Sequence, residues 1–593
     1  MGVLQMIVPT QRHGAQVLAD DSTCFALWAP DARSVVLMLW TGESVAMQAS
    51  GNGWYEVCHP CGDGMDYRFL INGEVLVPDP AARAQVDQPW GWSRVVDHGR
   101  YQWQTKHWNG RPWHETVIYE VHVGLLGGFD GVRAQLAALA ELGVTAIELM
   151  PVAEFPGTRN WGYDGVLLFA PQESYGTPAD LKALIDTAHE LGLMVFIDVV
   201  YNHFGPEGNY LGEYARRFFR EDIQTPWGWA IDFRRQEVRD FFCENALMWV
   251  LDYRVDGLRF DAVHAIAEKD FLVELAMRVR AAIPAARHVH LMLENEGNDP
   301  ALLQQGFDAQ WNDDGHNVLH HLLTGEKEGY YSEFAEAPTV QLARFLAEGF
   351  VFQGEEDRQG RARGAPSGHL PATSFILFLQ NHDQIGNRAF GERLNRLAYS
   401  DALAAATVLL LLSPMVPLFF MGDEWGSQQP FLYFTDHSAE LAKAVCAGRR
   451  NEFAGFDQFS DSKLRELIPD PNAPSSFHNS RPDYGAPRSA EQQQWQDLYR
   501  RLLSVRATEI IPRLVGVYSA GVTILAEGAV SAFWRMGDGC LLRIDLNLGK
   551  AAVAIKAPWA QVRILFNQGV EESAYKQGVL PPQSALASLD KGI

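Results

Sequence analysis

Apolar and polar positions change their spacing twice along the chain. From about Cys24 to Tyr101, short β-branched and aromatic runs such as CFALWAP and SVVLMLW are separated by turn residues, which is typical of a small β-sandwich. After about Val515, short runs of the same kind return, among them SAFWRM and GCLLRIDLNL. The pattern therefore predicts a β-sandwich at each end of the chain, over 1–108 and 515–593.

Between these ends, an apolar strand, a turn and an amphipathic helix recur in that order. VIYEVHV is followed by VRAQLAALAELG, and DLKALIDTAHELG precedes LMVFIDVVYNH. Such repetition predicts parallel strands joined by crossover helices, and the length suits eight of them. We expect an α/β fold, a (β/α)8 TIM barrel over 109–514, with an insertion at 202–245 after the third strand. The expected strands are 117–123, 146–151, 194–199, 257–261, 291–294, 307–311, 375–380 and 417–421.

The charge balance narrows the class of ligand. The chain of 593 residues has 73 acidic and 49 basic side chains, for a formal net charge of −24. Such a chain repels a nucleic-acid backbone and an anionic membrane surface, so neither is an expected partner. A neutral substrate fits better.

The N-terminal residues, the apolar stretches and the cysteines together predict a cytoplasmic protein. The first residues, MGVLQMIVPTQRHGAQVLADD, lack the basic run and apolar core of a signal peptide. The longest apolar stretch, Ala404 to Met421, contains two prolines, which favours a buried helix that runs into a strand over a membrane span. Six cysteines are too few for a disulfide-built scaffold, and the Cys58-x-x-Cys61 pair has no second pair to complete a metal site.

Polar side chains stand at the ends of four of the expected strands. An isolated acid at a strand end often caps the next helix or faces solvent. Side chains at the carboxyl ends of barrel strands converge on one mouth, however, so a coincidence of several favours a catalytic site. Strand three ends with Asp198 and His203, strand four with Arg259, Asp261 and His264, strand five with Glu294, and strand seven with His382 and Asp383.

Three of these carboxylates suit the cleavage of a glycosidic bond. That reaction needs an ionised carboxylate at the anomeric carbon and a protonated carboxyl at the leaving oxygen. Arg259 lies two residues before Asp261, on the same strand face, and can keep that acid ionised, which makes Asp261 the candidate nucleophile. Glu294 is the candidate general acid and base. Asp383 is the candidate stabiliser of the positively charged transition state.

Further side chains are candidates for binding the sugar. His382 and His203 would hold hydroxyl groups beside Asp383, and Tyr163, in NWGYD after strand two, would stack on the sugar ring at the cleavage point. A rim aromatic without a function is the alternative for Tyr163. Asp198 is expected to have a supporting role.

Short segments around these residues resemble the α-amylase superfamily. DVVYNH, GLRFDAVH, LMLENE and QNHDQIGN match its four motifs in order. The resemblance implies that Asp261 is the nucleophile, Glu294 the acid and base, and Asp383 the stabiliser of a retaining hydrolase.

A narrower resemblance covers nearly the whole chain. NWGYDG, VVYNHFGPEGNYL, TPWGWAIDF, AQWNDDGHNVLHHL and PFLYFTDH are similar to segments of the maltooligosyltrehalose trehalohydrolase family. The expected sandwich over 1–108 resembles the immunoglobulin-like, starch-binding-type domain that this family shares with branching and debranching relatives. The resemblance to the family implies cleavage of the α-1,4 bond next to the terminal trehalosyl unit of maltooligosyltrehalose, with release of trehalose. It also implies related α-glucans as ligands, a functional pairing with a synthase that forms the substrate, and neither a metal ion nor a cofactor.

Two departures from the family pattern and two other functions remain open. The loop after strand one is a short GLLGGF, and strand eight carries GDEW in place of GEEW. His264 is either a contact of the trehalose-side sugar or a structural residue. The alternatives are a branching-type glucan transglycosylase with the same acids and a glucan-binding protein without activity. We expect selectivity for trehalose to come from the 202–245 insertion, including Trp227, and from the rim between Trp311 and His316.

Overall fold

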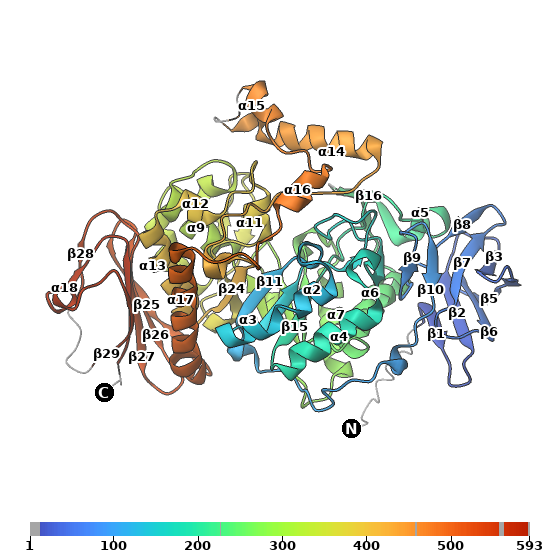
Figure 1. Cartoon of the computed structure of the whole chain (residues 1–593), viewed down its shortest axis with the longest axis horizontal. Coiled ribbons are helices and arrows are strands. Elements are labelled where there is room, and N and C mark those ends of the chain that lie inside the picture. The colour runs from blue at the N-terminus through green and yellow to red at the C-terminus, as the bar shows by residue number, and fades with distance from the viewer. Residues whose placement is uncertain (1–11, 226, 457–458, 460, 557–561, 591–593) are drawn as a thin grey trace. The chain divides into compact units, whose positions relative to one another are not determined.

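The computed structural model describes residues 12–225, 227–456, 459, 461–556 and 562–590 (Figure 1). The described residues form two compact units. The first comprises residues up to 110, 126–134 and 149–291, and the second comprises 111–125, 135–148 and 292 onward. The start of the chain, on which the expectation about a signal peptide depends, and Pro226 of the TPWG segment lie outside the described residues.

Eight parallel strands close into a barrel, which confirms the expected fold class. All eight expected strands are present. Five of them are shorter than expected, because residues at one or both ends of the expected range lie outside the strand. In barrel order they are β11 (Ile118–Val121), β12 (Ala146–Leu149), β15 (Met194–Val199), β18 (Gly257–Phe260), β19 (His290–Leu293), β20 (Ala309–Trp311), β23 (Phe375–Leu377) and β24 (Val416–Phe420).

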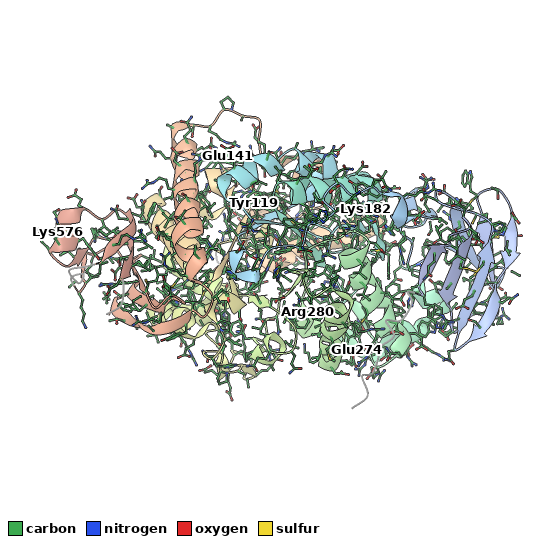
Figure 2. All side chains as sticks on the ribbon, turned by 90° about the horizontal axis from the view of Figure 1, so that it is seen from below. Tyr119, Glu141, Lys182, Glu274, Arg280 and Lys576 are labelled. Atoms are coloured by element: carbon green, nitrogen blue, oxygen red, sulfur yellow. A yellow bond between two sulfur atoms is a disulfide. The ribbon has the colours of Figure 1, made fainter. Side chains whose placement is uncertain are left out.

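Local sequence explains where the helices begin. α4 (Pro178–Glu190) starts with a proline after a capping box in which Thr177 and Asp180 bond to each other's backbone. On the same helix Lys182 is buried and donates to the backbone oxygen of His98 at 3.0 Å (Figure 2). The other long helices are α3 (Leu136–Leu142), α6 (Gln236–Leu251), α7 (Lys269–Ala282), α9 (Asp313–Thr324), α10 (Pro338–Glu348), α13 (Ser400–Leu412), α14 (Ala439–Glu452) and α17 (Ala490–Val505).

The apolar stretch from Ala404 to Met421 is a buried helix followed by a barrel strand, as expected. It comprises most of α13 and all of β24, and every residue of α13 from Ala402 onward is buried. Among the described residues, no helix is both long and apolar enough to span a bilayer.

Two antiparallel sheets precede the barrel. One has the order β1-β2-β6-β5, and the other has the order β4-β3-β7-β10-β9, with β8 paired to β7. Their bounds are β1 (Gly14–Val17), β2 (Thr23–Trp28), β3 (Val35–Leu39), β4 (Ser44–Ala46), β5 (Gln48–Gly51), β6 (Trp54–His59), β7 (Asp66–Ile71), β8 (Val75–Val77), β9 (Gln85–Val86) and β10 (Trp92–Arg94).

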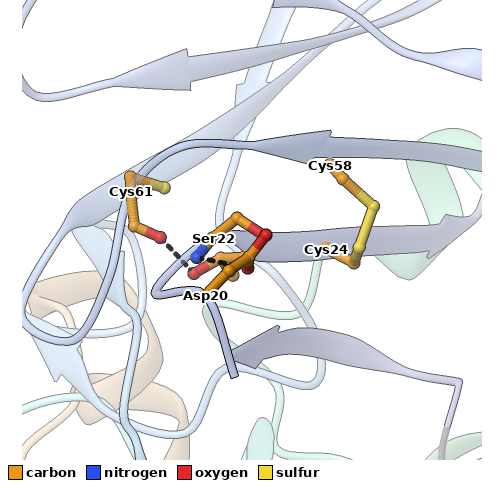
Figure 3. The surroundings of a disulfide bond; sticks show 6 residues. Asp20, Ser22, Cys24, Cys58 and Cys61 are labelled. Carbon is orange, nitrogen blue, oxygen red and sulfur yellow. Dashed lines mark hydrogen bonds between the residues drawn. A yellow bond between two sulfur atoms is a disulfide. The ribbon is translucent and has the colours of Figure 1, made fainter. Parts of the chain in front are cut away.

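A disulfide joins neighbouring strands of the first sheet. Cys24 of β2 lies directly opposite Cys58 of β6, and their sulfur atoms are bonded (Figure 3). Cys61 stays free and buried. The Cys58-x-x-Cys61 spacing therefore marks no functional pair. Cys58 is bonded to Cys24, 34 residues away in sequence, because the register of β2 and β6 places the two side by side.

The C-terminal part of the chain forms a five-stranded antiparallel sheet and a two-stranded sheet, whose strands alternate along the sequence with the last strands of the larger one. The larger sheet has the order β25-β26-β27-β31-β29 and packs against α10 and α13, while β28 pairs with β30. Their bounds are β25 (Tyr518–Ala526), β26 (Ala529–Arg535), β27 (Leu541–Asn547), β28 (Val553–Ala554), β29 (Arg563–Gln568), β30 (Val579–Leu580) and β31 (Ser584–Asp590).

The insertion after the third barrel strand has a structure of its own. It contains the short helix α5 (Leu211–Tyr214) and a hairpin of β16 (Phe219–Thr225) and β17 (Gly228–Ile231), and its last residues begin α6. Trp227 and Trp229, next to the hairpin turn, are about half exposed, at 46% and 50%.

Candidate active site

In the first unit, Arg259 connects two carboxylates at the ends of neighbouring barrel strands. β15 and β18 run parallel with Asp198 opposite Arg259. The buried guanidinium donates through Nη1 to Oδ2 of Asp198 and to Oδ1 of Asp261, each at 2.7 Å. Asp261 follows the strand directly, and 13% of its side chain is exposed. Since a buried guanidinium at this distance favours the charged form of both carboxylates, Asp261 is held ionised and in a fixed orientation.

The backbone after Asp261 is strained. Ala262 has a φ of +42°, in the left-handed region that residues with a Cβ rarely adopt. Strain of this kind costs about 1–3 kcal/mol and persists only where the surroundings impose it. Here the backbone N–H of Asp261 also bonds to the carbonyl of Val199 at 3.0 Å. The chain therefore turns sharply at this acid, as it does at many functional sites.

Tyr163 and His203 extend this cluster. The Tyr163 hydroxyl donates to Oδ2 of Asp198 at 2.6 Å, and Nε2 of His203 lies 3.0 Å from the Tyr163 carbonyl oxygen. Burial lowers the pKa of His203 to about 4, so the ring is neutral and donates only one hydrogen bond. We infer that Nε2 of His203 donates to the Tyr163 carbonyl, which leaves Nδ1 as an acceptor. The side-chain amide of Asn202, whose Oδ1 position is 3.0 Å from Nδ1, is then oriented with its nitrogen at that position. The indole of Trp227 stacks on the His203 ring, with the ring centroids 4.6 Å apart.

The buried neutral His203 makes the fold sensitive to acid. Its pKa is about 4 in the folded chain against an ordinary 6.5, so the unfolded chain binds the extra proton between these values. The contribution of His203 to the free energy of unfolding is fully present above pH 6.5. It is lost as the pH falls toward 4, which lowers the free energy of unfolding by about 3 kcal/mol. We expect His203→Gln to shrink the drop in thermal unfolding midpoint between pH 7 and pH 4.5. His107→Gln, at an exposed histidine, is the control and should keep the full drop.

In the second unit, a buried carboxylate orients a histidine toward an acid. Glu120 of β11 pairs with Nδ1 of His382 and accepts from the His382 backbone N–H at 3.1 Å, and both side chains are buried. Nε2 of His382 lies 3.5 Å from Oδ1 of Asp383. Asp383 is itself fixed, because its backbone N–H bonds to the capping side chain of Asn381 at 2.9 Å and Asn387 donates to its carboxylate at 3.2 Å. In the sequence, Glu120 is distinguished only as an acid inside the apolar run VIYEVHV.

Three carboxylates in the second unit act on one another electrostatically. Glu294 directly follows β19, and Asp313 is the first residue of α9. Burial, and then the nearby charges of Glu294 and Asp383, raise the pKa of Asp313 well above its ordinary value. The next residue differs, since Asp314 is buried and ion-paired with Arg363 at 2.6 Å. Of the two adjacent acids in WNDDGH, Asp314 therefore has a structural partner, while Asp313 belongs with the candidate catalytic acids.

The altered GDEW segment holds two buried acids that order the end of the eighth strand. Burial raises the pKa of Asp423 to about 6, although Arg393 lies 3.1 Å away and Gln380 donates to it at 2.6 Å. Burial also raises the pKa of Glu424 to about 7, and the hydroxyl of Tyr119 donates to it at 2.7 Å (Figure 2). Asp423, which stands where the family pattern has glutamate, is thus held by Arg393 and Gln380. The departure from GEEW therefore leaves the end of the eighth strand ordered.

The remaining site predictions are placed as follows. Tyr163, His203, Asp198, Arg259 and Asp261 lie in the first unit, and Glu294, His382 and Asp383 lie in the second. His264 has an exposed side chain in the short helix after β18. Across the part of the chain that the structure describes, no three His, Cys, Asp or Glu side chains are grouped as metal ligands would be.

Comparisons with known proteins fit this geometry. Residues 102–229 match the family model described as the α-amylase catalytic domain, and residues 519–587 match a domain of unknown function. A crystal structure from Salmonella typhimurium, titled a putative α-amylase, superposes with a TM-score of 0.91 at 42% identity, and the alignment covers 98% of this chain and 100% of that one.

Two curated relatives are similar over almost their whole length. The malto-oligosyltrehalose trehalohydrolase of Deinococcus radiodurans is 39% identical over 95% of both chains. The enzyme of the same name from a Rhizobium species is 36% identical over 98% of this chain and 100% of its own. The chain belongs to the malto-oligosyltrehalose trehalohydrolase family of the α-amylase superfamily.

Proposed function

We propose that the chain is a retaining glycosidase that cleaves the α-1,4-glucosidic bond next to the terminal trehalosyl unit of maltooligosyltrehalose and releases trehalose. The relatives' names supply the substrate class. The observation that carries the chemistry is the contact of Arg259 with Asp261, at 2.7 Å, because it keeps a carboxylate charged and aimed at the end of a barrel strand.

We place the three acids at one mouth by an argument from topology. Asp261, Glu294 and Asp383 each follow a strand of the closed barrel, after β18, β19 and β23. The carboxyl ends of barrel strands lie on one side, where the loops of (β/α)8 enzymes build their active sites. A substrate bound there would meet all three.

In the first step, Asp261 attacks the anomeric carbon while Glu294 gives its proton to the bridging oxygen. The bond from the anomeric carbon to that oxygen breaks, trehalose leaves with the proton, and the glucan chain remains as an ester on Asp261. Burial and the nearby charges of Glu294 and Asp383 raise the pKa of Asp313, so Glu294 stands among acids that act on one another, a setting in which a carboxyl group can serve as a general acid. Asp383, fixed by Asn381, stabilises the positive charge on the sugar ring.

In the second step, Glu294 takes a proton from water and the resulting hydroxide attacks the same carbon. The ester bond to Asp261 breaks, and the shortened glucan leaves with a new reducing end. Tyr163, His203 and His382 are proposed to hold the sugar beside the acids, and Asp198 to support Arg259. We propose that His264, on the exposed turn after Asp261, contacts the trehalose side.

Selectivity for trehalose is proposed to come from the aromatic hairpin of the 202–245 insertion and the rim from Trp311 to His316. Trp227 stacks on His203 and is 46% exposed, so its ring is fixed and accessible to a sugar. Unchanged selectivity in Trp227→Ala would remove this part of the proposal.

One experiment tests the proposed function. The protein is incubated with maltooligosyltrehalose and with plain maltooligosaccharide, and the products are separated and identified. Free trehalose from the first, with little cleavage of the second, is the expected result. New α-1,6 branches would show a transglycosylase instead, and no turnover of either sugar would leave only a binding role.

The cellular setting is part of the same proposal. A synthase that forms the trehalosyl end is the proposed functional partner, and the cytoplasm is the proposed location. The Cys24–Cys58 disulfide is unusual for a reducing compartment. We also propose three domains, 1–108, 109–514 and 515–593, with the ends formed by the antiparallel sheets.

A further inference from the structure

A cavity of about 570 Å³ lies in the first unit, lined by part of the segment that leads from the N-terminal sheets to the barrel. Small-molecule binding sites have volumes of about 300–1,000 Å³, so a ligand of that size fits here. The candidate catalytic and sugar-binding residues, all of which the structure describes, do not line it. Its chemistry depends on a few lining residues, which are His98, Tyr101, Trp103, Lys106, Asp252 and Arg254. We call it the Arg254 cavity.

The Arg254 cavity lies at the end of the barrel strands opposite to the candidate nucleophile. Asp252 and Arg254 come between α6 and β18, before the strand begins, whereas Asp261 follows that strand directly. The two ends of parallel barrel strands open on opposite faces, and active sites lie at the carboxyl ends. A ligand in the Arg254 cavity would therefore not compete with a substrate at the proposed cleavage site.

The guanidinium of Arg254 is held by stacking alone. It lies over the indole of Trp103, 4.6 Å from the ring centroid, and the Trp103 ring lies edge-on to that of Tyr101, with centroids 4.9 Å apart. Within the described part of the chain, no hydrogen bond or ion pair engages this guanidinium. Arginine stays charged in proteins, so its N–H donors are available to a ligand that carries acceptor oxygens.

The backbone at Arg254 is strained. Its φ is +57°, in the left-handed region that glycine and asparagine adopt more readily than arginine. A residue with a Cβ held there costs about 1–3 kcal/mol, and such residues cluster at ligand-binding and catalytic sites. Arginine at this position therefore indicates a function for its side chain and not a contribution to stability.

Two buried cations lie behind the wall of the cavity at His98. The ring nitrogens of His98 are shielded from solvent and have no hydrogen-bond partner among the described residues. Burial, and then the charges of Lys182 and Arg83, hold the pKa of His98 well below its ordinary value, so the ring is neutral. Lys182 donates to the His98 carbonyl at 3.0 Å (Figure 2), and Arg83 donates to two other carbonyls. In the part of the chain that the structure describes, neither cation forms an ion pair with a carboxylate.

Three acids lie near these cations, and two of them are engaged within the protein. Asp97 pairs with Arg100 at 3.5 Å. Asp186 accepts from the Tyr101 hydroxyl at 3.3 Å and from two backbone N–H groups of the same segment, at 2.8 and 3.0 Å. These bonds fix the segment that carries the aromatic rings. The third acid, Asp252, lines the cavity itself.

The lining suits a ligand that is part anion and part sugar. Lys106 and Arg254 outnumber Asp252 among its charged side chains, although the whole chain has a formal charge of −24. A planar guanidinium can bind two oxygens of a phosphate side by side, and an ammonium group adds a second positive charge. The rings of Tyr101 and Trp103 suit the apolar face of a sugar, and a carboxylate accepts from its hydroxyl groups. The cavity is larger than a phosphate ion alone would fill.

We propose that the Arg254 cavity is a binding site for a small phosphorylated sugar. The phosphate is bound by Arg254 and Lys106, and the hydroxyl groups are bound by Asp252. Such binding is independent of the proposed function, because none of the candidate catalytic residues takes part in it.

Equilibrium dialysis of the full-length protein against radiolabelled glucose 6-phosphate tests the proposal. We expect bound label that unlabelled glucose 6-phosphate displaces. Inorganic phosphate and glucose should each need at least about tenfold higher concentrations to displace it, since each offers only half of the ligand's contacts. AMP, which carries a phosphate on a nucleoside, should also compete at least about tenfold less well.

Arg254→Asn removes the central cation and should weaken binding of glucose 6-phosphate by about 10- to 100-fold, the loss expected for charge-assisted hydrogen bonds. Asparagine tolerates the positive φ at this position, so the unfolding midpoint should not fall. Arg33→Asn is the matched control, because it removes the same charge from an arginine with 81% of its side chain exposed. This variant should bind glucose 6-phosphate like the wild type.

Several results would overturn the proposal. Without bound label at millimolar glucose 6-phosphate, the cavity would not be such a site. Equal binding by wild type and Arg254→Asn would place the ligand elsewhere. Competition by glucose or by inorganic phosphate as strong as by glucose 6-phosphate would show that only one half of the ligand is recognised, and equal competition by AMP would indicate a nucleotide site. Release of trehalose is measured separately, so a failure of the proposed function would leave these results unchanged.

Discussion

Asp261→Asn is expected to lower the turnover number for trehalose release by at least about 10³-fold, because an amide cannot form the covalent ester that divides the reaction into two steps. The fold should persist, since Arg259 keeps its ion pair with Asp198 at 2.7 Å and the amide oxygen can still accept from Nη1. Turnover is measured by the trehalose formed at saturating substrate, and the unfolding midpoint is measured on the same samples.

Asp270→Asn is the matched control for this substitution. Asp270 lies on α7 with 72% of its side chain exposed and pairs with Arg239, so its amide form should retain full turnover. Near-normal activity of Asp261→Asn would show that another group attacks the sugar. Loss of activity together with a large fall in the unfolding midpoint would instead assign Asp261 a role in folding, as a partner of the buried Arg259.

The barrel and its acids were predictable because they depend on local pattern. The eight apolar runs specify the strands. Asp261 and Glu294 directly follow such runs, and Asp383 comes shortly after one, in the helix that begins at His382. The contact between Arg259 and Asp261 followed from the two-residue period of a strand, which places both side chains on one face.

Contacts between distant segments were not predictable in this way. Glu120 and His382 are 262 residues apart, and only the pairing of β11 and β24 around the barrel brings the first strand near the seventh and eighth. Asp314 forms an ion pair and Asp313 does not take its place there, because Arg363 lies next to Asp314. The sequence WNDDGH contains both acids without any sign of which one is paired.

Glu294→Gln is expected to abolish most release of trehalose but to spare a substrate that needs no acid. Trehalose leaves as an alkoxide unless it is protonated, so the loss of the general acid should lower turnover by about 10²–10⁴-fold. A maltooligosyl fluoride leaves as fluoride without a proton, and Asp261 is intact in this variant. The first step should therefore stay fast with the fluoride, and the glucan ester should accumulate, because the base for the second step is also missing.

Mass spectrometry of the protein after mixing with the fluoride measures that ester directly. We expect the mass of Glu294→Gln to increase by one glucan chain. The double variant Asp261→Asn, Glu294→Gln should show no such increase. Adding azide, a nucleophile that needs no base, should then release the glucan as an azide and restore turnover with the fluoride. Glu296→Gln, two residues away and exposed, is the control that should behave like the wild type. If the fluoride were hydrolysed at the wild-type rate by Glu294→Gln without accumulation of the ester, Glu294 would not be the base of the second step. The neighbouring acid Asp313, whose pKa is raised by burial and by the charges of Glu294 and Asp383, would then be the next residue to test in that role.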